Sequence, residues 1–156
     1  MTAPLIQTVT PETLTAFHAG LRHLSDHLGD AHRADADALG AALFGPQPFA
    51  LGLMAADGTG ALLAMPMFST IHGGPGVYVS DLWVAEAARG SGMGRRLLSA
   101  ALNQTIWGTP RFLKLTVYSD NPAARAVYDR LGFQPQDADT VMLLEGAPLT
   151  VLRDAG

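Results

Sequence analysis

Apolar residues recur every three to four positions between residues 14 and 28, which predicts an amphipathic helix buried along one face. The stripe consists of Leu14, Phe17, Leu21, Leu24 and Leu28. Thr10 is a residue type that caps helices, and Pro11 suits the first helical position, so we expect the helix to begin at Pro11 and to end at Gly29. A short strand over residues 5–9 precedes it, and a second helix from Asp35 to Phe44 follows.

The middle of the chain has the pattern of an antiparallel meander. Two apolar runs between residues 49 and 69 flank Asp57-Gly58, a pair that predicts a hairpin because glycine tolerates positive φ. Pro66 inside the second run predicts an edge position or a bulge, since proline donates no ladder hydrogen bond. Residues 77–85 form the next predicted strand.

The second half of the chain alternates helical and extended patterns. A helix is expected to run from the glycine-rich stretch after residue 88 to Gly108, with Leu97, Leu98, Ala101, Leu102 and Ile106 as its buried stripe. Residues 111–119 predict a strand. Asn121 then caps a helix that ends at Gly132. Two short strands over residues 140–144 and 148–152 complete a mixed α/β layer structure.

Composition narrows the class of protein. The 156 residues fit one domain spanning 1–156, and 48% hydrophobic against 15% charged residues can fill a core. A formal net charge of -4 without a basic run disfavours a nucleic-acid or membrane-surface partner. The chain has no cysteine, which excludes thiol catalysis and disulfides. Neither a signal peptide nor a membrane span is recognisable, so we expect a soluble, cytoplasmic protein.

The stretch RGSGMG, residues 89–94, joins a predicted strand to a predicted helix. A helix N-terminus with glycines offers unpaired N–H groups to an anion, and phosphate is the usual occupant. A P-loop would need Lys-Ser/Thr where Arg95 and Arg96 stand. The dinucleotide fingerprint has a different glycine spacing and follows an early strand. A phosphate-binding loop of another kind is therefore indicated.

This loop resembles the Arg/Gln-x-x-Gly-x-Gly/Ala motif of the GNAT superfamily of acetyl-coenzyme A-dependent N-acetyltransferases. Recognisable motifs cover roughly residues 49–134. The resemblance implies a twisted, mostly antiparallel mixed sheet of about six or seven strands, with helices on both faces and a splayed central parallel pair. It also implies that the coenzyme A pyrophosphate lies on a loop comprising Arg89, Gly90, Ser91, Gly92, Met93, Gly94 and Arg95.

A second stretch, NPAARAVYDRLGF at residues 121–133, resembles the other hallmark of the same family. The resemblance implies that Asn121 and Ala124 contact the cofactor. It makes Tyr128 both a cofactor contact and the general acid that protonates the leaving thiolate. A phenol with a pKa near about 10 can donate to a thiolate of comparable basicity. The same resemblance assigns backbone contacts with the acetyl-pantetheine arm to Leu82, Trp83 and Val84.

The general base is left open by the sequence. Some polyamine-type relatives carry Glu-Asp-x-x-Val on the strand before the loop, whereas this chain has Ser80 at the glutamate position and Asp81 after it. Strand alternation predicts that the two side chains point to opposite faces. Asp81 is then either a structural hydrogen-bond anchor or the base, and a water relay through Ser80, Tyr78 or backbone carbonyls is the alternative.

Histidines gather near the end of the first predicted helix. His23 and His27 are four residues apart, a spacing that could ligate a metal, but the glutamate of a zincin motif is missing and we expect no metal. In the resembling family the first two helices line the acceptor pocket. The resemblance therefore implies weak acceptor-binding candidates, namely Arg22, His23, Asp26 and His27, with Tyr78 on the strand.

The function implied is transfer of the acetyl group of acetyl-CoA to a primary amine of a small molecule. Direct attack is the simplest route because the chain has neither a cysteine nor a G-x-S-x-G serine motif. Two alternatives stay open: acetylation of a protein or peptide amine, and a non-catalytic acetyl-CoA-binding sensor. Relatives often dimerise, so the resemblance is also compatible with a homodimer.

Overall fold

Contacts between residues divide the chain into two units, one ending at Tyr118 and the other running from Ser119 to Gly156. The computed structural model describes residues 2–156. The first unit contains β1 (Ile6–Thr8), α1 (Leu14–Leu28), α2 (Ala36–Phe44), β2 (Leu51–Ala55), β3 (Gly60–Ser69), β4 (Gly74–Val84), the 3-10 turn η1 (Glu86–Ala88), α3 (Met93–Leu102), η2 (Thr105–Trp107) and β5 (Leu113–Leu115). The second contains α4 (Pro122–Leu131) and α5 (Gly146–Arg153). Among the residues described, no helix is long and apolar enough to cross a membrane.

The strands form one sheet in the order β1-β2-β3-β4-β5, in which only β5 runs parallel to its neighbour. The predicted hairpin at Asp57-Gly58 is confirmed, and the Asp57 carboxylate accepts hydrogen bonds from the hydroxyl (2.6 Å) and the amide (3.1 Å) of Thr59. These bonds hold the pKa of Asp57 below its usual value. Pro66 lies where β3 continues past its last pair with β2, Leu51↔Ala64, so it occupies an edge as predicted.

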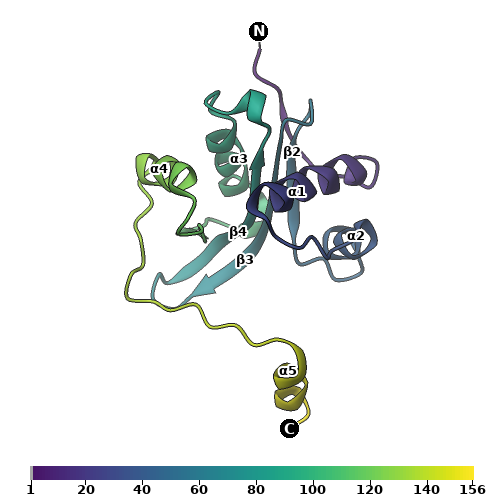
Figure 1. Cartoon of the computed structure of the whole chain (residues 1–156), viewed down its shortest axis with the longest axis vertical. Helices are drawn as coiled ribbons and strands as arrows, with labels where there is room; N and C mark the ends of the chain where they lie inside the picture. Colours follow the sequence, from purple (N-terminus) through teal and green to yellow (C-terminus); the bar gives the residue numbers. More distant parts are fainter. Residues whose placement is uncertain (1) are drawn as a thin grey trace. The chain divides into compact units, whose positions relative to one another are not determined.

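Helices cover both faces of this sheet, with α1 and α2 on one side and α3 on the other (Figure 1). The helices pack closely against the sheet on both of its faces. A Cβ added to Gly20 of α1 would lie 3.1 Å from the Trp83 ring of β4, and one added to Gly60 of β3 would lie 3.0 Å from Leu97 and Met93 of α3. The largest fully buried side chains are Phe17, Leu53, Leu62, Leu97 and Val77.

The parallel pair of strands separates partway along its length. β4 and β5 pair only from Val77↔Leu113 to Val79↔Leu115, although β4 continues to Val84. A bulge begins at the same point, because Leu63 and Ala64 of β3 pair with Asp81 and Val79 and leave Ser80 as the extra residue. A bulge bends its strand and increases the local twist, so β4 diverges from β5 after the bulge. The expected splayed pair is thus present.

Two helix boundaries differ from the prediction. The first helix begins at Leu14 rather than Pro11, because Thr10 and Thr13 close a turn in which the Thr10 amide donates to Thr13 Oγ1 (2.8 Å). The helix after the glycine loop ends at Leu102 rather than Gly108. Ile106, predicted to be buried, is 65% exposed, while Trp107 is buried and its indole N–H donates to the Ala101 carbonyl (2.7 Å).

The sheet has five strands rather than six or seven. The predicted strand over residues 111–119 is reduced to Leu113–Leu115, and the two C-terminal strands are absent: residues 140–145 have no regular structure and residues 146–153 form α5. Pro148 explains the preference for a helix. Proline lacks the N–H that a strand ladder needs, whereas the first turn of a helix leaves its donors unpaired in any case.

Candidate functional site

The glycine-rich loop between β4 and α3 takes its shape from two residues with positive φ. Gly90 has φ +76° and Gly92 has φ +84°, values that side chains other than glycine rarely adopt. A Cβ added to either residue would meet no atom within 4 Å. The backbone conformation, rather than crowding, therefore requires glycine at these two positions.

Side chains of the loop are anchored to the main chain. Arg89 Nε donates to the carbonyl of Val84, the last residue of β4, over 3.2 Å. Ser91 Oγ donates to the Ala88 carbonyl over 2.6 Å. These bonds fix the loop directly before the helix and hold the Arg89 guanidinium beside the end of the strand.

The N-terminus of α3 presents unpaired backbone donors. Gly92 caps the helix without a side-chain hydrogen bond, and the first helical bond is donated by the Arg96 amide to the Gly92 carbonyl (3.1 Å). The amides of Met93, Gly94 and Arg95 precede it and have no acceptor within the helix. Together with the positive end of the helix dipole, they have the chemistry that attracts a phosphate-like anion.

Gly94 has a different role from the other two glycines of the loop. Its φ is not positive, and a Cβ there would lie 3.9 Å from Val84 and 4.0 Å from Leu82, which is ordinary contact. Gly94 is the second residue of α3, and an alanine would fit there. Neither backbone shape nor packing therefore requires glycine, and the missing side chain leaves free space between the α3 amides and the end of β4.

The end of β4 directs main-chain groups toward the gap beside β5. The Ala85 amide donates to Thr59 on the β3 side (2.9 Å). Because antiparallel strands alternate their hydrogen-bonding edges, the amides of Leu82 and Val84 face the opposite edge. The Trp83 side chain instead packs on α1, where its ring stacks with His23 at a centroid distance of 5.5 Å.

The bulge on β4 corrects the predicted arrangement of Ser80 and Asp81. Alternation would place the two side chains on opposite faces, but Ser80 Oγ donates to Asp81 Oδ2 over 2.6 Å. The extra residue interrupts the alternation and brings the hydroxyl and the carboxylate together. The two groups therefore form one hydrogen-bonded unit where the parallel strands begin to separate.

The second motif folds as predicted within the unit of residues 119–156. Asn121 caps α4 by accepting a hydrogen bond from the Ala124 amide (3.2 Å), and Gly132 ends the helix with φ +93°. The Phe133 amide donates to the Tyr128 carbonyl (3.0 Å), and the two rings meet edge to face with centroids 5.4 Å apart. Burial raises the pKa of the Tyr128 phenol.

The expected acceptor-binding residues are dispersed over α1 and β4. Arg22, His23, Asp26 and His27 are exposed on α1, and Tyr78 is half-buried on β4. Of these, His23 reaches β4 through its stack with Trp83. No group of three or more histidines, cysteines or carboxylates suited to a metal occurs among residues 2–156.

Two connections near α1 were missed by sequence reasoning. His32 bonds to Ser25 (2.8 Å) and to His18 (3.2 Å), which ties the α1–α2 connection to α1. The Tyr118 hydroxyl donates to Asp30 (3.0 Å) and links that connection to the chain after β5. Tyr118 and Asp30 are 88 positions apart, so no local pattern could have indicated this contact.

Comparison with known proteins gives a family match over most of the chain. The model of the acetyltransferase (GNAT) family matches residues 18–133. Two curated proteins match over shorter stretches. N-alpha-acetyltransferase 40 of Saccharomyces cerevisiae (strain ATCC 204508 / S288c) is 42% identical over 66 residues, covering 38% of this chain and 23% of that protein. Mycothiol acetyltransferase of Nocardioides sp. (strain ATCC BAA-499 / JS614) is 45% identical over 71 residues, covering 43% and 24%.

The chain therefore spans about a quarter of the length of these curated relatives. A solved structure of the aminoglycoside N-acetyltransferase AAC(6')-Iy in complex with CoA superposes with a TM-score of 0.72 at 17% identity. That match covers 92% of this chain and 94% of the other. At this level of identity the likeness concerns the fold.

Proposed function

This chain belongs to the acetyltransferase (GNAT) family, and on that premise we propose that it transfers the acetyl group of acetyl-CoA to a primary amine of a small molecule. Members of the family take the acetyl group from acetyl-CoA. The observation that carries the proposal is the space left by Gly94 beside the free amides of α3. A pyrophosphate fits this chemistry because it is an anion that backbone N–H groups can approach closely.

The proposed cofactor contacts follow from this geometry. The amides of residues 93–95 hold the pyrophosphate, and Arg89 adds positive charge from its anchored position at the end of β4. The open edge of β4 beyond the bulge receives the pantetheine arm through the backbone of Leu82 and Val84. An amide there can stabilise negative charge on the acetyl carbonyl oxygen during attack by the amine.

We propose that Asp81 accepts the proton that the acceptor amine loses. The amine must lose a proton to become a nucleophile, and a carboxylate within reach can accept it directly or through one water molecule. Ser80 keeps that carboxylate oriented by donating to Oδ2. Tyr128 supplies the proton that the departing thiolate needs. A tyrosine phenol is neutral at physiological pH, and burial, which raises the pKa of Tyr128, favours this form further.

The acceptor is proposed to enter beside α1 and β4. The His23–Trp83 stack provides a flat aromatic wall there, and Asp26 offers a negative charge to an ammonium group. The likeness to N-alpha-acetyltransferase 40 supports a second candidate, the N-terminal amine of a peptide. An acceptor screen by mass spectrometry, in which each amine is tested for the addition of one acetyl group, distinguishes the two classes.

The same screen tests catalysis itself. Incubation with acetyl-CoA and a reactive amine is expected to release free thiol in proportion to the acetylated product. If the protein binds coenzyme A tightly but acetylates no small amine and no peptide in a broad panel, the enzymatic proposal is wrong and the domain is a sensor.

Replacing Gly94 by leucine tests the cofactor site. The new side chain fills the space beside the α3 amides, so we expect the Kd for coenzyme A, measured by calorimetry, to rise about 10–100-fold, equivalent to about 1.4–2.8 kcal/mol. Stability should not fall, because leucine is a better helix former than glycine. Ser99→Leu adds the same side chain at an exposed position of α3 and serves as the control. Unchanged affinity in Gly94→Leu would contradict the pyrophosphate assignment.

Replacing Asp81 by asparagine tests the base. The change removes the negative charge and keeps the shape, so kcat/KM is expected to fall about 100-fold near pH 7. The loss should shrink at high pH, where the free amine is already neutral. Ser80→Ala should have a smaller effect, and Glu86→Gln on the exposed 3-10 turn should have none. A pH–rate profile of Asp81→Asn identical to that of the unchanged protein would refute the role.

A further inference from the structure

Lys114, the middle residue of β5, is the single lysine of the chain, which also carries nine arginines. Within residues 2–118 no carboxylate pairs with it, since the one ion pair of the described chain, Arg125 with Asp129, lies in the second unit. A lysine ammonium has three hydrogen-bond donors and no acceptor. The first unit therefore offers this positive charge to an anion that it does not itself supply.

The register of the sheet places Lys114 next to Tyr78, because the two residues pair between β5 and β4. Side chains of paired residues on neighbouring strands lie on the same face of the sheet. Val77 and Val79, on either side of Tyr78, are buried and point to the other face. Across β4, Tyr78 pairs with Met65 of β3. Lys114, Tyr78 and Met65 therefore form one row across three strands on a single face.

Asp81 lies on this same face of the sheet. Its partner on β3 is Leu63, which is two residues from Met65, so the two β3 side chains point the same way. Leu63 packs against the buried cluster that includes Phe17 of α1 and Leu39 of α2. The face that carries the carboxylate and the ammonium group is thus the one on which the acceptor is proposed to enter.

Lys114 and Asp81 are diagonal neighbours across Tyr78. Along β3, the two positions that separate the partners of Asp81 and Tyr78 cover about 7 Å, and adjacent strands lie about 5 Å apart. The two Cα atoms are therefore about 8 Å apart, a diagonal distance that long side chains can span. The Asp81 carboxylate is held by Ser80, whereas the lysine has a flexible four-carbon stem. The two groups can bind opposite ends of one small molecule that lies over Tyr78.

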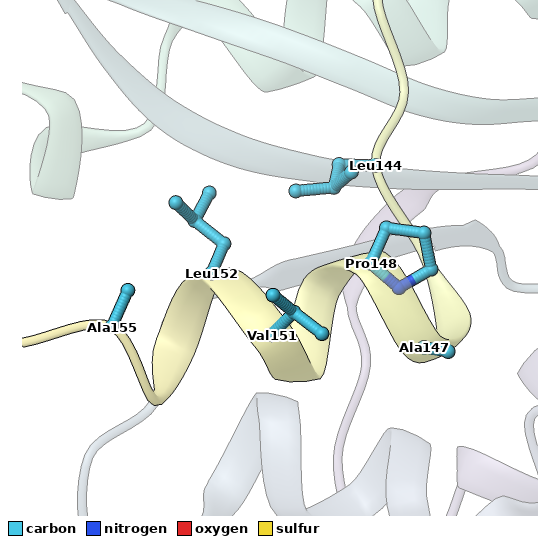
Figure 2. Close-up of a pocket in the computed structure, with 6 residues that line it drawn as sticks. All are labelled: Leu144, Ala147, Pro148, Val151, Leu152 and Ala155. Atoms are coloured by element: carbon cyan, nitrogen blue, oxygen red, sulfur yellow. The ribbon is translucent and has the colours of Figure 1, made fainter.

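The hollow along α5 has a different chemistry (Figure 2). The residues that line it are Leu144, Ala147, Pro148, Val151, Leu152 and Ala155. None of these side chains carries a charge or a hydrogen-bonding group. A charged amine or carboxylate would lose its hydration there without gaining a partner. A small molecule with both groups is better served by Lys114 and Asp81.

We propose that Lys114 binds the carboxylate of the acceptor and that the acceptor is an amino acid, an inference that rests on the proposed function. The amine of the amino acid then lies beside Asp81. Its nitrogen bonds to the acetyl carbon and loses a proton to Asp81, while the carbon–sulfur bond of the thioester breaks. The leaving thiolate takes a proton from Tyr128. The products are an N-acetyl amino acid and coenzyme A.

Paired acceptors test the inference. Each common amino acid is compared with its amide, which keeps the amine but lacks the carboxylate, by the release of free thiol from acetyl-CoA. The unchanged protein should prefer the acid form of its best acceptor about 10–100-fold in kcat/KM, as expected for a hydrogen bond between charged groups. Lys114→Met should reduce this preference to within a few fold, mainly through KM, whereas Lys114→Arg, which keeps the positive charge, should retain it.

Two results of this comparison would overturn the inference and leave the acetyltransferase proposal in place. One is a preference for the acid form that persists in Lys114→Met, which would make the lysine a bystander. The other is an unchanged protein that acetylates amides or peptides as well as it acetylates free amino acids.

Chemical labelling gives a second readout that needs neither turnover nor a variant. Because Lys114 is the only lysine, mass spectrometry of the peptide that contains it reports its reaction with acetic anhydride directly. In the presence of coenzyme A, N-acetyl amino acids are added one at a time. At least one of them should slow the labelling several-fold, and its amide should not.

The labelling separates the inference from the function on which it rests. Protection of Lys114 by an N-acetyl amino acid, without acetylation of any amine, would support the carboxylate contact and count against the acetyltransferase proposal alone. If no acid of the panel protects Lys114, the inference is wrong, whether or not the protein acetylates other amines.

Discussion

Replacing Tyr128 by phenylalanine is expected to lower kcat for acetyl transfer about 10²–10³-fold, in the lower part of the range of about 10²–10⁴-fold that general acid–base catalysis contributes. The substitution removes only the phenol oxygen. The ring stays packed against Phe133 at the end of α4, so the helix should keep its stability and the affinity for coenzyme A should change little. Release of free thiol at saturating concentrations of both substrates measures the effect.

The pH dependence separates an acid from a merely structural tyrosine. Because burial raises the pKa of the Tyr128 phenol above its ordinary value of 10.0, the neutral acid persists throughout pH 6–9 and is lost only as pH rises through the raised pKa. At pH values above this raised pKa the unchanged protein should lose activity, whereas Tyr128→Phe, which has no phenol to ionise, should show no such loss. Tyr118→Phe removes the same atom from an exposed tyrosine and should keep kcat within a few fold. Equal losses in both variants would remove Tyr128 from the mechanism.

Replacing Gly76 by alanine is expected to destabilise the protein by about 2–4 kcal/mol, at the upper end for overpacking. A Cβ at this position of β4 would lie 2.3–2.5 Å from three carbons of the Phe112 ring. That ring cannot move away easily, because it stacks on His72 at 4.5 Å and the Phe112 carbonyl accepts from the Val77 amide (3.0 Å). Urea unfolding should show a lower midpoint with an unchanged slope.

A double-mutant cycle assigns that loss to the ring. Phe112→Leu should destabilise the unchanged protein but relieve the clash in Gly76→Ala, so the two effects should be strongly non-additive. Gly94→Ala is the matched control, because its Cβ reaches only ordinary contact distance, and it should stabilise rather than destabilise. Additive losses would mean that the β4–β5 junction accommodates the extra methyl group without involving Phe112.

Much of the candidate site could be predicted because its signals are local. Gly90 and Gly92 have the positive φ that a tight loop before a helix requires, and Asn121 and Gly132 cap α4 within a few residues of sequence. The unpaired amides at the start of α3 likewise need only a strand, a glycine loop and a helix in succession. Such features depend on neighbouring residues, so a short stretch of sequence is enough to predict them.

The pairing of Ser80 with Asp81 could not be predicted in the same way. A bulge depends on the register that β4 adopts against β3, and that register is set by contacts spread over both strands. The burial of Trp107 in place of Ile106 was not predicted either, since the chain leaves the helix after Leu102 and the Trp107 indole N–H donates to the Ala101 carbonyl.

The sequence by itself determined the glycine loop, the caps of α4, the hairpin and the order of most elements, because each follows from the backbone preferences of adjacent residues. Only the tertiary structure decided where β4 bulges, how far β5 extends and that residues 146–153 form a helix instead of a strand. A strand forms only where another strand satisfies its backbone hydrogen bonds, whereas a helix satisfies its own. Strand formation is therefore the property that a single stretch of sequence predicts least well.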